Sequence, residues 1–213
     1  MIQERTSTRF FDLALGVDLA ERILVTLLFL NLCTKFVGAS IHQLNLVYLL
    51  IVLSEFCNVA LILLRGVAKQ VSLHVQDWAV AALGTGLPLT ALPHGPSPVA
   101  PLVVCTGLIL FGIVFQLTSK LFLNRSFGIV PANRGVRTRG PYAFIRHPIY
   151  CGYTLTHIGF LLFAPNLWNL SVYVLAFACQ ISRVFREERV LSQDAGYRNY
   201  MEAVPYRLLP WIF

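Results

Sequence analysis

The chain has 213 residues, of which 56% are hydrophobic and only 13% are charged, and its mean hydropathy is +0.67. A soluble domain carries about 25% charged residues, so this composition excludes a water-soluble protein and predicts an integral membrane protein. The net charge of +7 does not indicate nucleic-acid binding, because the bases lie in short connections between apolar runs, where they meet anionic headgroups. The five cysteines stand singly inside apolar segments, so we expect packing roles and no metal site.

Six apolar segments approach the length of about 20 residues that a bilayer-spanning helix needs. In chain order they are Ile23–Ile41, Leu44–Leu64, Trp78–Leu92, Leu102–Leu123, Ile149–Phe163 and Leu167–Ile181. Because the third, fifth and sixth are short, the sequence predicts an all-α, multi-pass transmembrane bundle of five or six spans. Glu55 and Asn58 fall inside the second segment, where we expect a polar contact in the protein interior.

The charges in the connections between the apolar segments indicate how the chain is oriented across the membrane. Residues 120–146 contain no acid and six bases, namely Lys120, Arg125, Arg134, Arg137, Arg139 and Arg146. With six spans, the positive-inside rule places this connection, the 65–77 connection and both termini in the cytoplasm. We therefore expect a multi-pass protein of a bacterial inner membrane or the endoplasmic reticulum.

After Asp77, the next acidic residues in the chain follow the last apolar segment. Glu187 and Glu188 lie in a helical stretch from about Ile181 to Gln193, with one charged and one apolar face. We expect this stretch to emerge into the cytoplasm and to end at Ala195-Gly196. A further short helix or turn is expected from Tyr197 to Tyr200.

The densest pattern of the chain follows the basic connection. It reads Gly140-Pro-Tyr142-Ala-Phe-Ile-Arg146-His147-Pro148-Ile-Tyr150-Cys-Gly152. Pro148 suits the first turn of a helix, where its missing N–H costs nothing. On that helix Tyr150, Thr154 and His157 share one face, and Gly152 and Gly159 form another on which a neighbouring helix can approach closely.

Together with Glu-Glu-x-x-Leu from Glu187 and the terminal Tyr-x-x-Tyr-x-x-x-Val-Pro-x-Arg-x-x-Pro from Tyr197, this pattern resembles the isoprenylcysteine carboxyl methyltransferases. Their wider relatives include the phospholipid methyltransferases. The resemblance covers roughly residues 120–213, so we expect one integrated membrane domain with N-terminal helices over 1–119 and a catalytic region over 120–213. The stretch Asn124–Pro131 lacks the histidine that the prenylcysteine enzymes carry, which leaves the acceptor open.

The resemblance implies S-adenosyl-L-methionine as cofactor, entering a C-terminal helical site from the cytosol. It implies a lipophilic small molecule or lipidated acceptor from the bilayer, such as a prenylcysteine carboxylate, a lipid amine or a thiol. The implied catalytic residues are Arg146, His147 and Glu188, and the implied substrate-binding residues are His157 and Arg207. The implied cofactor-binding residues are Gly140, Tyr142, Arg146, His147, Pro148, Tyr150, Glu187, Glu188, Tyr197 and Tyr200.

These residue types fit the chemistry of methyl transfer. An arginine such as Arg146 can bind the donor carboxylate in a bidentate contact, and a glutamate can accept from ribose hydroxyls or the ammonium group. Tyrosine rings can pack on adenine or on the sulfonium charge. His147 is the candidate base for an amine or thiol acceptor.

Other interpretations remain open. Arg146 and His147 could anchor a helix at the headgroups, and both glutamates could pair with Arg183 on a solvated helix. Sterol reductases, which bind NADPH, have a similar C-terminal stretch, but their motif reads Arg-His-x-Asn-Tyr and their chains are longer. A non-catalytic membrane protein that retained the fold is the third alternative.

Overall fold

Helices make up nearly all the regular structure of the computed structural model, which describes residues 16, 18–30, 46–65, 70–72, 74–92 and 95–213. Residues 18–30 are helical. The later elements are α2 (Leu46–Leu64), β1 (Gln70–Val71), α3 (Val75–Gly86), η1 (Leu87–Thr90), α4 (Leu102–Leu123), η2 (Asn124–Ser126), β2 (Ala132–Asn133), η3 (Gly140–Ala143), α5 (Pro148–Phe163), α6 (Leu167–Leu191) and α7 (Ala195–Ala203). The predicted all-α class is confirmed.

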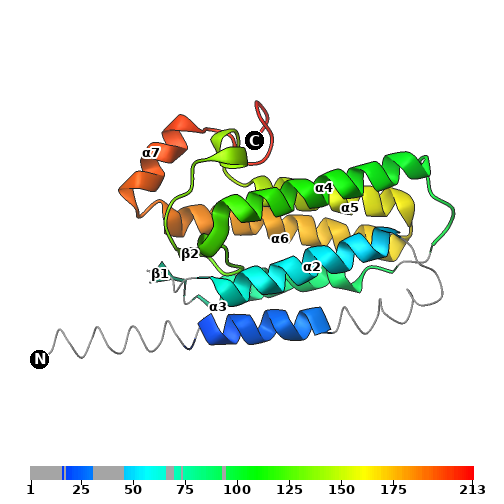
Figure 1. Cartoon of the computed structure of the whole chain (residues 1–213), viewed down its shortest axis with the longest axis horizontal. Coiled ribbons are helices and arrows are strands. Elements are labelled where there is room, and N and C mark those ends of the chain that lie inside the picture. The colour runs from blue at the N-terminus through cyan, green and yellow to red at the C-terminus, as the bar shows by residue number, and fades with distance from the viewer. Residues whose placement is uncertain (1–15, 17, 31–45, 66–69, 73, 93–94) are drawn as a thin grey trace, which may run out of the picture.

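The long helices lie side by side in an elongated bundle (Figure 1). Helices α2, α4 and α6 end, and α3 and α5 begin, at the end of the bundle that also holds α7 and the C-terminus. The two short strands pair antiparallel at the same end, with Gln70 opposite Asn133. The motif-bearing segments are therefore gathered at one end of the bundle.

Among the described helices, α4 and α6 are long and apolar enough to cross a bilayer. The outer face of α4 carries Val103, Phe111, Val114 and Leu121, all exposed. An apolar surface of this kind is rare on a soluble monomer and suits contact with lipid chains. The count of five or six spans stays a prediction, and part of the first predicted segment, residues 31–41, lies outside the described residues.

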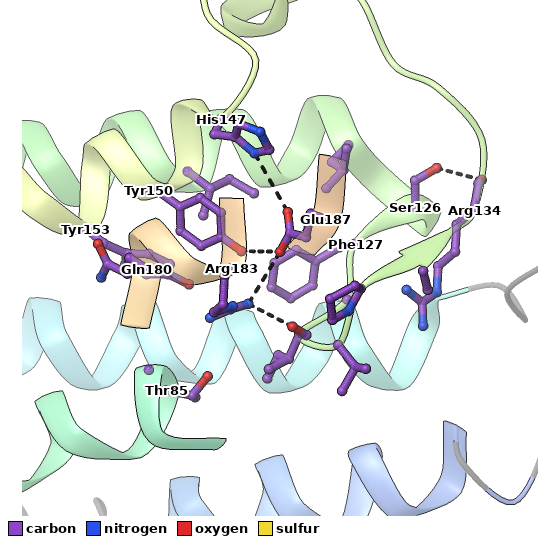
Figure 2. Close-up of a pocket in the computed structure, with 18 of the residues that line it drawn as sticks. Thr85, Ser126, Phe127, Arg134, His147, Tyr150, Tyr153, Gln180, Arg183 and Glu187 are labelled. Carbon is purple, nitrogen blue, oxygen red and sulfur yellow. Dashed lines mark hydrogen bonds and ion pairs between the residues drawn. The ribbon is translucent and has the colours of Figure 1, made fainter. Parts of the chain in front are cut away.

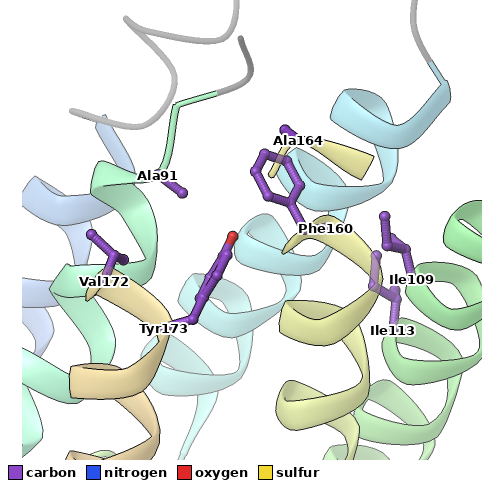
Figure 3. Close-up of a cluster of buried hydrophobic side chains, with 7 residues drawn as sticks. All are labelled: Ala91, Ile109, Ile113, Phe160, Ala164, Val172 and Tyr173. Carbon is purple, nitrogen blue, oxygen red and sulfur yellow. The ribbon is translucent and has the colours of Figure 1, made fainter. Parts of the chain in front are cut away.

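Glycines bring α4 and α5 into close contact. A Cβ on Gly152 would lie 2.8 Å from the backbone nitrogen of Gln116, and one on Gly159 would lie 2.9 Å from the carbonyl oxygen of Cys105. The predicted glycine face of α5 is thus confirmed. At the opposite end from the motifs, Phe160 of this helix packs in an apolar cluster (Figure 3), whose other members are Ala91, Ile109, Ile113, Ala164, Val172 and Tyr173.

The helix ends follow local signals, with one correction. Pro148 occupies the first turn of α5, as predicted. The side chains of Asn166 and Asp194 accept hydrogen bonds from the backbone at the starts of α6 and α7. The expectation that Ala195-Gly196 ends the charged helix was wrong, because α6 ends at Leu191 and the Asp194 cap makes Ala195 the first residue of α7.

Candidate active site

A cavity lies at the motif-bearing end of the bundle. Most of one wall is formed by residues 126–137, here called the cavity loop, all of which line it except Asn133. Other lining residues come from the N-terminal helix and from α2, α3, α5, α6 and α7. The predicted site residues that line it are Tyr142, His147, Tyr150, His157, Glu187, Tyr197 and Tyr200. Four separate parts of the chain therefore contribute motif residues to one chamber.

Glu187 is the predicted acid that faces this cavity (Figure 2). The hydroxyl of Tyr150 donates to its Oε1, and Nη2 of Arg183 lies 3.9 Å from the same oxygen. Nδ1 of His147 lies 3.7 Å from Oε2. The carboxylate thus accepts one hydrogen bond, lies near two further cationic or titratable side chains and lines the cavity.

Glu188, about 100° further around α6, does not line the cavity. Its Oε1 accepts from Nε of Arg146 at 2.8 Å and lies 3.2 Å from Nε2 of His147. Its Oε2 accepts from Nε of Arg207 at 2.9 Å. Glu188 therefore joins the two motifs from behind the cavity wall.

Arg146 lies in this network and does not line the cavity. Its Nη1 donates to the carbonyl oxygens of Val204 at 2.9 Å and Pro205 at 3.1 Å. Because Arg146 and His147 are both only 6% exposed, they do not fit the alternative of a basic pair at the headgroups. The geometry gives Arg146 a positioning role, and its direct contact with a cofactor stays a prediction.

Three buried tyrosines line the cavity near α7. The hydroxyl of Tyr200 donates to the carbonyl oxygen of Tyr142 at 2.7 Å, and the rings of Tyr197 and Tyr200 meet edge to face. Burial raises the pKa of each of the three phenols above its ordinary value. They are neutral aromatic walls at physiological pH.

Two other predicted site residues, Gly140 and Arg207, lie outside the cavity and make packing or ionic contacts. Gly140 has a φ of 63°, and a Cβ there would lie 2.6 Å from the ring of Phe122, so only glycine fits. Arg207, besides its bond to Glu188, lies over the rings of Phe185 and Phe213. Neither Gly140, Pro148 nor Arg207 lines the cavity.

His157 lies deeper in the bundle, with its ring stacked 4.7 Å from that of Tyr173 and 6.3 Å from that of Tyr153. A second, smaller cavity shares His157, Tyr153 and Glu55 with the main one. The amide of Asn58 donates to Glu55 at 2.8 Å, which confirms the expected contact between these two residues. Both of them also line the main cavity.

Three arginines that line the cavity, Arg134, Arg137 and Arg183, were not assigned to the site from the sequence. Arg183 donates to the carbonyl oxygen of Ile129 at 2.9 Å and lies over the Tyr150 ring, while Arg134 packs on Gly128. The Nε atoms of Arg134 and Arg183 are buried, and no group in the described part of the chain accepts a hydrogen bond from either of them. Burial lowers the pKa of Arg134 to about 10. The i,i+4 spacing of Arg183 and Glu187 was the available signal, but spacing alone could not show that both face inward.

The fold and the site define a class, namely a helical membrane protein with a polar, aromatic cavity at one end of its bundle. Residues 100–197 match the sequence model of the family described as phospholipid methyltransferase. This match confirms the expected resemblance to the phospholipid methyltransferases over residues 100–197. No curated protein matches the chain.

Proposed function

We propose that this protein is an S-adenosylmethionine-dependent methyltransferase of the membrane, acting on a lipophilic acceptor. The observation that carries the proposal is the Glu187 carboxylate at the cavity wall, held by Tyr150 and Arg183 within the region that matches the methyltransferase family. The family match favours this function over the sterol reductase alternative.

The cavity residues fit the groups of the proposed donor. Glu187 can accept from its ammonium group or ribose hydroxyls, and the Nε atoms of Arg134 and Arg183, unpartnered among the described residues, can donate to its carboxylate. Tyr142, Tyr197 and Tyr200 offer aromatic faces for adenine. The pocket therefore has a cation acceptor, anion donors and stacking surfaces within one chamber.

When bound, the donor supplies an electrophilic methyl group on a sulfonium. The chain contributes orientation and exclusion of water, which are the main sources of rate in a displacement of this type. Glu188 holds His147 through Nε2, and Nδ1 remains on the Glu187 side. An amine or thiol acceptor would lose its proton to this histidine, whereas a carboxylate acceptor needs no base.

The acceptor is proposed to enter from the bilayer. The second cavity supports this route, because it extends the main one between the spans and is lined by Ala91, Ile113 and Phe160 beside its polar residues. In this proposal, residues 120–213 form the catalytic region, 1–119 supply membrane helices, and the site and both termini face the cytoplasm of a multi-pass protein. The candidate acceptors remain a prenylcysteine carboxylate, a lipid amine and a thiol.

Titration calorimetry with S-adenosylhomocysteine on the detergent-purified protein tests the donor. We expect saturable binding that Glu187→Gln weakens by about ten-fold, the effect of losing a hydrogen bond to a charged group. Glu202→Gln, an exposed glutamate of α7, is the matched control and should bind as the unaltered chain does. No detectable binding to the unaltered protein would sink the proposal.

A second experiment classifies the acceptor. Membranes containing the protein are incubated with methyl-labelled donor and separated into lipid and protein fractions. Base-labile label indicates a methyl ester, and base-stable label indicates N- or S-methylation. Absence of label above that of membranes lacking the protein would contradict methyl transfer.

A further inference from the structure

A buried glutamate of the N-terminal helix contacts the cavity loop. Glu21 is 1% exposed, and its Oε1 accepts from the backbone nitrogens of Ile129 at 2.5 Å and Val130 at 3.1 Å. Arg65, which follows α2, lies 2.8 Å from each oxygen of this carboxylate. Arg134 of the loop itself lies 3.7 Å from it. One carboxylate therefore connects two N-terminal segments to the wall of the cavity.

The same stretch of the cavity loop is held from its other side. Nη2 of Arg183 donates to the carbonyl oxygen of Ile129, the residue whose N–H is bound by Glu21. Arg183 also lies 3.9 Å from Glu187 and over the ring of Tyr150 (Figure 2). A chain of contacts therefore runs from Glu21 through the backbone N–H and C=O of Ile129 to Arg183, and from Arg183 to the Glu187 carboxylate.

We propose that Glu21 is a positioning residue of the active site, which sets the cavity loop and Arg183 in the arrangement that receives the methyl donor. The inference rests on the proposed function for the identity of the donor. It extends the site to a helix that lies outside the matched residues 100–197. Loss of the carboxylate frees two backbone N–H groups and lets the Ile129 carbonyl move away from Arg183.

The chain contains a matched control for a merely structural role. Asp18, one turn earlier on the same helix, is buried and also binds Arg65, with Oδ1 at 2.7 Å from its Nη2. Its described partners are Arg22 and Arg65, and none of its described contacts is with the cavity loop. Removing either acid removes one of the two carboxylates that bind Arg65, but only Glu21 also binds the cavity loop.

The experiment compares Glu21→Ala, Glu21→Gln and Asp18→Ala in two measurements on the detergent-purified full chain. In calorimetry with S-adenosylhomocysteine, we expect Glu21→Ala to bind about ten-fold more weakly, since two hydrogen bonds to a charged group are lost. Asp18→Ala should bind within about two-fold of the unaltered protein, because the described contacts of Asp18 are with Arg22 and Arg65 and not with the cavity loop. Glu21→Gln, which keeps an acceptor oxygen at the same reach, should recover part of the affinity.

The second measurement, amide hydrogen exchange without any ligand, does not depend on the donor. Exchange at residues 129 and 130 should rise in Glu21→Ala and stay at the unaltered level in Asp18→Ala. Equal effects of Glu21→Ala and Asp18→Ala in either measurement would overturn the inference. If the unaltered protein fails to bind S-adenosylhomocysteine, the proposed function fails, and the exchange measurement alone still decides the role of Glu21.

Discussion

The carboxylate of Glu188 lies 2.8 Å from Nε of Arg146, which joins two motifs 42 positions apart in the chain. Arg207 and His147 complete the arrangement around the same carboxylate. Glu187, the next residue, faces the cavity instead. The adjacent acids therefore have different surroundings: Glu188 lies within the network of Arg146, His147 and Arg207, and Glu187 lines the cavity.

Glu188→Gln should lower the stability of the protein. Removing one partner of a buried charge network leaves Arg146 with an uncompensated charge, which costs about 3 kcal/mol. Denaturation of the purified protein in mixed micelles measures the change. The exposed Glu202→Gln control should shift stability by less than about 0.5 kcal/mol. A Glu188→Gln variant as stable as this control would contradict the assigned network.

Tyr150→Phe should weaken donor binding with little effect on folding. Its hydroxyl donates to Glu187, so its removal lets the cavity carboxylate move. We expect affinity for S-adenosylhomocysteine to fall about five-fold, while stability changes by less than about 1 kcal/mol. Calorimetry and micelle denaturation on the same preparation separate the two effects. Unchanged affinity would show that this hydrogen bond does not prepare the site.

Gly152→Ala should destabilise the bundle by about 1 to 3 kcal/mol, because the added methyl group meets the backbone of α4 at 2.8 Å. Gly107→Ala is the matched control within α4, since no atom lies within 4 Å of a Cβ at that position. The control should be neutral or slightly stabilising, as alanine favours a helix. Equal destabilisation of the two variants would contradict the close packing of α4 and α5.

Alkaline pH should destabilise the α7 end of the protein through its buried phenols. Burial raises the pKa of Tyr200, so the folded state favours the protonated phenol. The contribution of the protonated phenol to folding stability is complete below the ordinary phenol pKa of about 10 and is lost as pH rises above it. Thermal unfolding followed across this range should show a steep fall for the unaltered chain and a shallower one for Tyr200→Phe. Tyr206→Phe, which removes a half-buried phenol, should keep the steep fall.

His157→Phe should affect the acceptor more than the donor. The ring lies beside Tyr173, at the boundary shared by the two cavities. We expect KM for the acceptor to rise about ten-fold, the order of a lost buried hydrogen bond, with affinity for S-adenosylhomocysteine unchanged. Methyl-transfer kinetics at varied acceptor concentration provide the measurement. A variant that loses donor affinity instead would place His157 in the donor site.

The sequence by itself determined the helical class, the membrane character, the motif residues and most helix bounds. Hydropathy acts locally, so the apolar run Leu102–Leu123 could be recognised without any knowledge of its neighbours. The glycine face of α5 and the start at Pro148 were predictable for the same reason. The resemblance to the phospholipid methyltransferases was also carried by residues close together in the chain.

Only the tertiary structure decided which side each charged group takes. Glu187 and Glu188 are equivalent in the sequence, and their surroundings differ because Arg146 and Arg207 bind Glu188 whereas Glu187 lines the cavity. Glu21 could not be assigned, since its partners Ile129 and Val130 lie more than a hundred positions away. Long-range burial of a charge depends on packing between helices, and no local pattern of residues encodes it.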